Sequence, residues 1–153
     1  MWRRVIVLLL ITVFLTGCVD KEMFEVGMGM KKEHEEYVLE KYDKSEEWFD
    51  DSDGREWVDY CKYYYTSQDE KLFKDSKKYK KIESEDEIQE ITKVVNAFCS
   101  SSLKEPEKYD FTTDVIEKND YYALIEKERH FALFYYDVES GILYYLHSVG
   151  IDY

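Results

Sequence analysis

The spacing of apolar residues gives its clearest helical signal over residues 84–103. Within this segment the apolar side chains recur at intervals of three and four residues, at Ile88, Ile91, Val95 and Phe98. Ser84 and Glu87 form a capping box at its start, and Pro106 lies just beyond its end. The pattern predicts one amphipathic helix whose apolar face packs on another element.

Runs of β-branched and aromatic residues after this helix predict four strands, at 111–116, 121–126, 131–137 and 142–148. Short polar connections separate these runs, which is typical of an antiparallel meander. Trp57 to Thr66 predicts a further strand, and Asp53-Gly54 before it predicts a hairpin turn. The segment 33–42 fits a helix and a strand about equally well. We therefore expect an α+β fold, with an antiparallel meander of four to six strands packed on one capped helix.

The last two predicted strands carry apolar or aromatic residues on both faces, so we expect them at the centre of the sheet. The helix would cover one face, and many of the 15 tyrosines would line the other. An exposed tyrosine face would make a good binding platform, because each ring offers a large contact area and a polar tip. The alternative, which we favour, is that the tyrosines fill half-buried strand positions and bind nothing.

A different pattern occupies the N-terminal residues. Arg3 and Arg4 precede an apolar run from Val5 to Leu15, in which Thr12 is the one polar residue. As a helix this run would span about 16 Å, roughly half of a ~30 Å hydrocarbon core. That length indicates a signal peptide and is too short for a transmembrane helix.

The end of the apolar run, Leu15-Thr16-Gly17-Cys18, resembles the lipobox of bacterial lipoproteins. The resemblance implies that residues 1–17 are a lipoprotein signal peptide that is removed, and that Cys18 carries a diacylglyceryl anchor. The protein would then be held on the extracytoplasmic face of the cell membrane. Two acyl chains make such an anchor stable.

The residues after Cys18 show no helical or strand period, and Gly27 and Gly29 interrupt them. We interpret 18–30 as a flexible tether and 31–153 as a single α+β domain, since about 120 residues suffice for one core.

Charge narrows the choice of partners. The chain has 34 acidic against 21 basic residues and a net charge of −13. This balance argues against a nucleic-acid-binding protein, because phosphates need a basic patch. If charge selects a partner, that partner is a cationic peptide, a basic secreted protein or a metal ion. An aromatic content of 17% argues against a disordered acidic tail.

A second resemblance covers roughly residues 57–151. It is to a group of small uncharacterised exported or lipid-anchored proteins of Gram-positive anaerobes, and four segments carry it: D-Y-C-K-Y-Y-Y-T, K-Y-D-F-T-T-D-V-I, N-D-Y-Y-A-L-I and L-Y-Y-L-H-S. No activity is attached to this group. The resemblance therefore implies the architecture and an extracytoplasmic location, and nothing about chemistry.

The three histidines are His34, His130 and His147, and none lies in a metal-binding motif. His130 and His147 flank the last hairpin and would share a face in one strand register but not in the next. We take them as rim residues, with a metal-binding or catalytic pair as the less favoured alternative.

Cys61 and Cys99 remain after the lipobox cysteine. Export would place them in an oxidising compartment, so a disulfide between them is one expectation. Two separately buried thiols are the other. Nothing nearby in the sequence supplies a base that would activate either thiol.

Other chemistry is not indicated. An EF-hand loop with its glycine at Gly54 would need oxygen ligands at Phe49 and Tyr60, so we favour a plain Asp-Gly turn over a calcium site. There is no nucleophile elbow and no glycine-rich phosphate loop. We predict no catalytic residue, no metal ligand and no cofactor.

Together these patterns favour a lipid-anchored extracytoplasmic binding protein without catalytic activity. Its partner would be cationic, as for an immunity or inhibitor protein that neutralises a basic toxin. The alternatives are a structural or accessory subunit of a cell-envelope complex and, less favoured, an envelope hydrolase.

Overall fold

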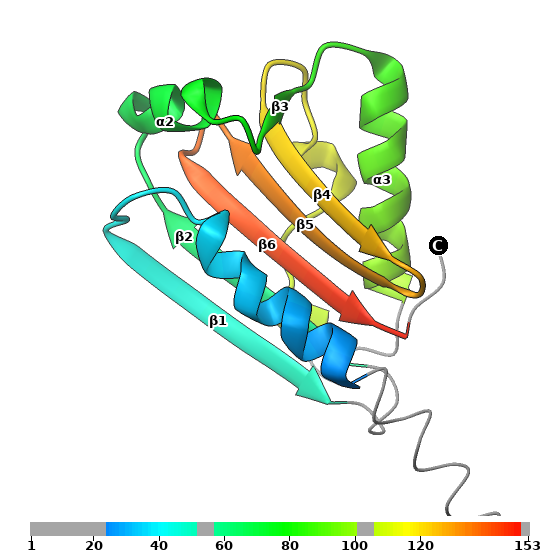
Figure 1. Cartoon of the computed structure of the whole chain (residues 1–153). Helices are drawn as coiled ribbons and strands as arrows, with labels where there is room; N and C mark the ends of the chain where they lie inside the picture. Colours follow the sequence, from blue (N-terminus) through cyan, green and yellow to red (C-terminus); the bar gives the residue numbers. More distant parts are fainter. Residues whose placement is uncertain (1–23, 52–56, 101–105, 151–153) are drawn as a thin grey trace, which may run out of the picture.

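The computed structural model describes residues 24–51, 57–100 and 106–150, and its six strands form one antiparallel sheet in the order β1-β2-β6-β5-β4-β3 (Figure 1). The strands are β1 (Lys44–Asp51), β2 (Trp57–Tyr64), β3 (Lys80–Lys81), β4 (Tyr121–Lys127), β5 (His130–Asp137) and β6 (Ile142–Val149). The described helices are one over 24–33, α2 (Glu70–Asp75) and α3 (Glu85–Ser100). Short 3-10 turns lie at His34–Glu36, Ser67–Asp69, Pro106–Lys108 and Thr113–Val115. The predicted α+β class is confirmed.

β5 and β6 lie at the centre of the sheet, as their apolar pattern predicts. Leu133 and Phe134 are neighbours on β5 that face opposite sides, and neither has any exposed surface. Each face of the sheet therefore needs a cover, and the molecule has two cores.

Helix α3 covers one face. The oxygen of Ser84 accepts a hydrogen bond from the backbone N–H of Glu87, whose carboxylate accepts one from the backbone N–H of Ser84. These bonds are the predicted capping box. The apolar stripe of α3 is buried against the sheet in what we call the α3 core, which includes Ile91, Val94, Val95, Phe98, Tyr60, Phe131, Leu133 and Tyr135. The predicted helix is confirmed over 85–100, and 101–103 lie outside the described residues.

The prediction of a strand at 111–116 is wrong. Thr113–Val115 form a 3-10 turn, and Phe111 and Ile116 on its two sides are buried in the α3 core. The place beside β4 is taken by the short strand β3, which pairs with Tyr121 and Tyr122. The apolar residues of 111–116 therefore pack under a loop rather than in the sheet.

The hairpin predicted ahead of Trp57 is confirmed. β1 and β2 pair antiparallel with Trp48 opposite Tyr60. The Asp53-Gly54 turn itself lies in 52–56, outside the described residues. The segment 33–42 is neither a strand nor a long helix, since Glu33 ends the helix over 24–33 and only the turn His34–Glu36 follows it.

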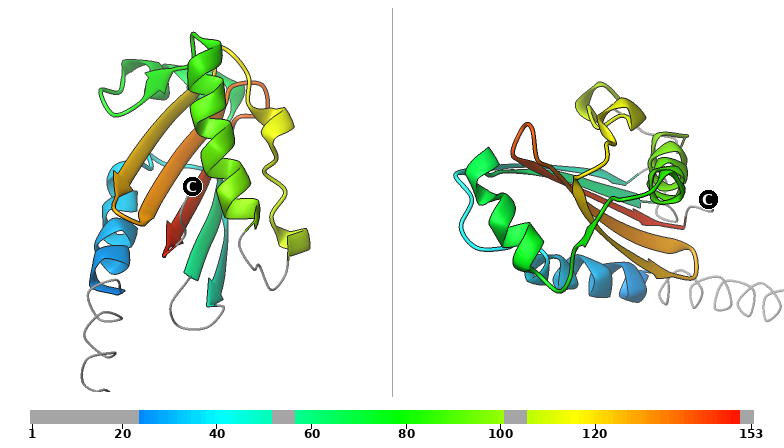
Figure 2. Two further views of the ribbon diagram at one scale, coloured as in Figure 1. Left: turned by 90° about the vertical axis from the view of Figure 1, so that its right-hand side faces the viewer. Right: turned by 90° about the horizontal axis from the view of Figure 1, so that it is seen from above.

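The prediction of a flexible tether over 18–30 is wrong for residues 24–30, and residues 18–23 lie outside the described residues. Residues 24–33 form a helix on the face of the sheet opposite α3 (Figure 2). Met30 has no exposed surface there, and a Cβ at Gly27 would lie 2.5 Å from Cγ2 of Val149 and 2.6 Å from Cζ2 of Trp57. The helix backbone therefore approaches the sheet as closely as a glycine allows. Within the three described ranges, no helix is both long and apolar enough to cross a membrane.

The expected exposed tyrosine face is wrong as well. Helix 24–33 and α2 cover it, and we call the packing beneath them the N-terminal core, which includes Met30, Cys61, Tyr63, Tyr65, Phe73, Phe134, Tyr136 and Tyr145. The ring of Phe73 from α2 stacks on Tyr136 with centroids 3.7 Å apart. Tyr136 and Tyr145 are at most 1% exposed. The tyrosines of this face fill packed positions, which was the alternative.

Candidate functional site

The residue predicted to carry lipid, Cys18, lies in 1–23, outside the described residues. Cys61 and Cys99 both carry free thiols. Cys61 is buried in the N-terminal core, whereas Cys99 is exposed on α3 across the sheet. The disulfide expected between them is therefore not formed, and a bond across the sheet is geometrically excluded.

Neither thiol is set up as a nucleophile. Burial raises the pKa of Cys61 to about 12, and the nearby carboxylates of Glu47 and Asp59 add to the effect. Partial burial also raises the pKa of Cys99. Both groups stay protonated at neutral pH, where only a thiolate would react.

All three histidines lie on the face that helix 24–33 covers. His147 pairs with Ala132 and His130 with Val149, so the two histidines are diagonal neighbours on adjacent strands. This is the register that places them on one face. They are 0% and 2% exposed, and are therefore core residues, not the rim residues we expected. His34, just after the helix, stacks on Tyr145 with ring centroids 5.4 Å apart.

A buried polar cluster joins these histidines to the helix, and we call Lys31, Asp59, His130 and His147 the Asp59 cluster. Oδ2 of Asp59 lies 3.1 Å from Nδ1 of His147, and Oδ1 lies 3.1 Å from Nζ of Lys31. The side chains of Asp59 and His147 are 0% exposed. Burial lowers the pKa of Lys31, but the charge and hydrogen bond of Asp59 outweigh it, so the pKa is raised overall. Lys31 is thus the counter-ion of a buried carboxylate.

The Asp59 cluster contains a carboxylate–imidazole pair, but not in a place where it could act on a substrate. The ring of Trp57 lies edge-on to His147, with centroids 5.0 Å apart, and the side chains of Asp59 and His147 are both fully buried. Nε2 of His147 is buried and has no hydrogen-bond partner among the described residues. Among the residues that the structure describes, there is no group of three or more histidine, cysteine or acidic side chains that could hold a metal ion. The cluster fastens the helix to the sheet.

Acidification should weaken this fold through His130. Burial lowers the pKa of His130, as do the neighbouring His147 and Arg129, while Glu128 opposes them. The unfolded chain takes up a proton near the ordinary value of 6.5, but the folded protein does so only at lower pH. The contribution of neutral His130 to stability is therefore present above pH 6.5 and is lost as the pH falls below that value.

We expect the free energy of unfolding in urea to fall more in the unaltered protein than in His130→Gln as the pH is lowered from about 7 to about 5.5. Carboxylates titrate in both proteins, so the difference between the two isolates the histidine. Equal pH dependence of the two proteins would contradict the assignment.

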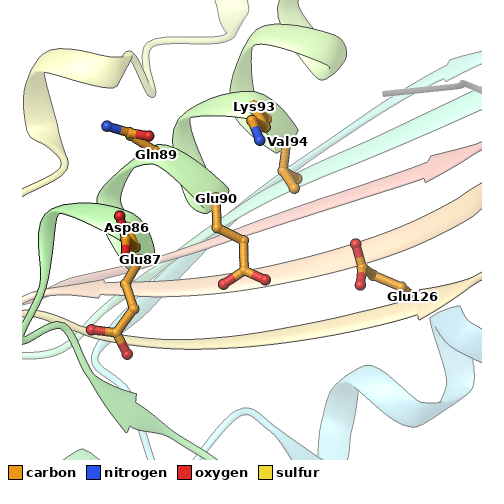
Figure 3. A pocket seen from close by; sticks show the side chains of 7 residues that line it. All are labelled: Asp86, Glu87, Gln89, Glu90, Lys93, Val94 and Glu126. Atoms are coloured by element: carbon orange, nitrogen blue, oxygen red, sulfur yellow. The ribbon is translucent and has the colours of Figure 1, made fainter.

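The described surface has one further feature, an open hollow of about 580 Å³ on the α3 side (Figure 3). It is lined by Asp86, Glu87, Gln89, Glu90, Lys93, Val94 and Glu126. Glu126 comes from β4 and the others from α3. Four of the seven lining residues are acidic and one is basic, so the hollow is strongly negative.

Local bonds hold part of this lining in place. The carboxylate of Glu87 accepts hydrogen bonds from the backbone of Glu83 and from Ser84, and these bonds lower its pKa. Glu90 accepts a 3.3 Å hydrogen bond from the hydroxyl of Tyr122. Burial, with the charges of Glu90 and Glu87, raises the pKa of Tyr122 to about 12, so it remains a neutral donor.

The hollow contains no histidine, cysteine or hydroxyl nucleophile, so its chemistry is that of charge. It can attract and hold a cationic group. The sequence predicted a cationic partner from net charge alone and did not locate this site. The sequence feature that could have indicated the hollow is the set of acidic residues at positions 86, 87 and 90, which lie beside the apolar stripe of the helix.

Comparison of the chain with protein-family models, with curated proteins and with solved structures found no match.

Proposed function

We propose that this chain is a lipid-anchored extracytoplasmic binding protein, and that its partner is a cationic protein or peptide. The anchor is the diacylglyceryl group that the lipobox-like segment implies on Cys18. The observation that carries the binding role is the acidic hollow between α3 and β4. An immunity or inhibitor protein directed against a basic partner is the form of this function that best fits a small acidic domain at the membrane.

Electrostatics supports this role. A lysine or arginine side chain that enters the hollow meets Asp86 and Glu90 from α3 and Glu126 from β4. A concave, low-dielectric wall strengthens the field of such carboxylates. The net charge of −13 adds long-range attraction, which raises the rate of encounter with a cationic partner.

The two alternatives have less support. An accessory subunit that binds a neutral partner through tyrosines would need those rings exposed, but Tyr136 and Tyr145 are buried under helices. A hydrolase would need its acid or base in contact with a substrate, and the Asp59–His147 pair is fully buried.

The test is binding of a fluorescent decalysine peptide to the detergent-solubilised full-length protein. We compare D86N/E90Q/E126Q with the control E35Q/E107Q/E139Q, which removes the same charge from exposed sites elsewhere. Three lost contacts at about 0.5 kcal/mol each should weaken binding about tenfold at low salt. The control should lose much less, and salt of about 0.5 M should abolish the difference.

Two results would reject the proposal. One is that the unaltered protein fails to bind the peptide at about 0.05 M salt, where screening is weak. The other is that D86N/E90Q/E126Q and the control lose affinity equally, which would mean that the hollow contributes nothing specific to binding.

A further inference from the structure

Two phenylalanines stand out from the rest of the described surface. Phe24 and Phe49 are each 57% exposed, and they are the large hydrophobic side chains that lie open to solvent in the described ranges. Phe24 begins the helix over 24–33, and Phe49 lies near the end of β1.

Both residues lie at one end of the sheet. Asp51 pairs with Trp57, and Trp57 pairs with Val149, so the end of β1, the start of β2 and the end of β6 meet there. Gly27 contacts the same Trp57 and Val149, which brings the start of the helix to that end (Figure 1).

The helix is fixed to the sheet at this end. Gly27 touches the sheet, and Nζ of Lys31 lies 3.1 Å from Oδ1 of Asp59. Nζ of Lys31 also lies 5.4 Å from the ring centroid of Phe49, a cation–π distance. Phe24 and Phe49 are therefore held on one rigid body, not joined by a flexible linker.

Chain length limits how far this end can lie from a lipid attached at Cys18. Phe24 is the sixth residue after Cys18 in the sequence, and even a fully extended chain of that length spans only about 20 Å. An anchored Cys18 would thus keep Phe24 within that distance of the bilayer surface.

We propose that Phe24 and Phe49 insert into the interfacial layer of the bilayer and fix the orientation of the domain on the membrane. This inference rests on the lipid anchor of the proposed function. Aromatic side chains at the acyl–headgroup boundary bury apolar surface about 5–10 Å deep, and they add to the hold of a lipid anchor. The acidic hollow is lined by α3 and β4, and α3 lies on the face of the sheet opposite helix 24–33.

The test measures membrane depth in the full-length lipidated protein, reconstituted in phosphatidylethanolamine–phosphatidylglycerol vesicles that contain acyl-brominated lipid. Tryptophan replaces one exposed residue at a time, in F24W, F49W and the control E139W. Glu139 is exposed in the turn between β5 and β6, at the other end of the sheet, where Tyr64 pairs with Ile142. The fluorescence of the unaltered protein is subtracted to remove the native tryptophans.

We expect brominated lipid to reduce the added fluorescence of F24W and F49W at least twofold and to leave that of E139W unchanged. If all three variants float with the vesicles but F24W and F49W are not quenched, the docking is overturned and the anchor stands. Equal quenching of E139W would overturn the fixed orientation. If the protein does not float with the vesicles, the anchor fails, and the docking that rests on it fails too.

Discussion

Replacing Lys31 with methionine should lower the free energy of unfolding by about 3 kcal/mol. The carboxylate of Asp59 is 0% exposed, and Lys31 is the cation in contact with its Oδ1. Methionine keeps most of the apolar stem but leaves a buried charge without its counter-ion, which is the costly way to break such a pair. Urea unfolding, followed by tryptophan fluorescence, measures the loss.

Lys32→Met is the matched control, because Lys32 is the next residue on the same helix and its side chain is exposed. Its effect should stay within about 0.5 kcal/mol. The double variant K31M/D59N should recover part of the stability that K31M loses, since it removes the stranded charge as well. If K31M and K32M are equally stable, the ion pair does not hold the helix.

Replacing Gly27 with alanine should destabilise the protein by about 2 kcal/mol, although alanine favours helices in general. The added Cβ would lie 2.5 Å from Val149 and 2.6 Å from Trp57. Both neighbours are buried, so neither can yield without disturbing the core. We expect amide hydrogen exchange in 24–33 to accelerate more than in β5, because the helix is pushed off the sheet.

Gly29→Ala provides the opposite result on the same helix. A Cβ at Gly29 would meet nothing within 4 Å, so alanine should stabilise the protein by roughly 0.5–1 kcal/mol. The two glycines thus test whether the helix is held by close backbone contact or by its own propensity. If Gly27→Ala stabilised the protein as Gly29→Ala is expected to do, close contact at Gly27 would be ruled out.

The elements that could be predicted from the sequence are those with a strong local signal. α3 has a capping box and a regular apolar stripe, and β4, β5 and β6 have β-branched and aromatic runs between short turns. The helix over 24–33 has no such signal, because two glycines lower its propensity and its contacts come from residues far along the chain. In 111–116 the apolar residues imitate a strand, but their burial comes from packing against α3.

The site residues show the same division. Asp59 is a single acid in an aromatic strand, and its position in the sequence did not mark it as part of a site. The partner, Lys31, is 28 residues away and could be found only once the helix was placed. The shared face of His130 and His147 depended on the strand register, which sequence does not determine. The acidic hollow required both α3 and Glu126 in position.

The position of β6 has a consequence for how the molecule is made. This strand pairs with β2 on one side and β5 on the other, although it follows both of them in the sequence. Without residues 142–149 the sheet divides into a hairpin and a separate three-stranded piece, so neither core can close. A ribosome-bound or partly translocated chain therefore cannot fold early. If the protein is exported as proposed, this delay keeps the preceding residues unfolded, and so able to pass through a narrow pore, until residues 142–149 follow them.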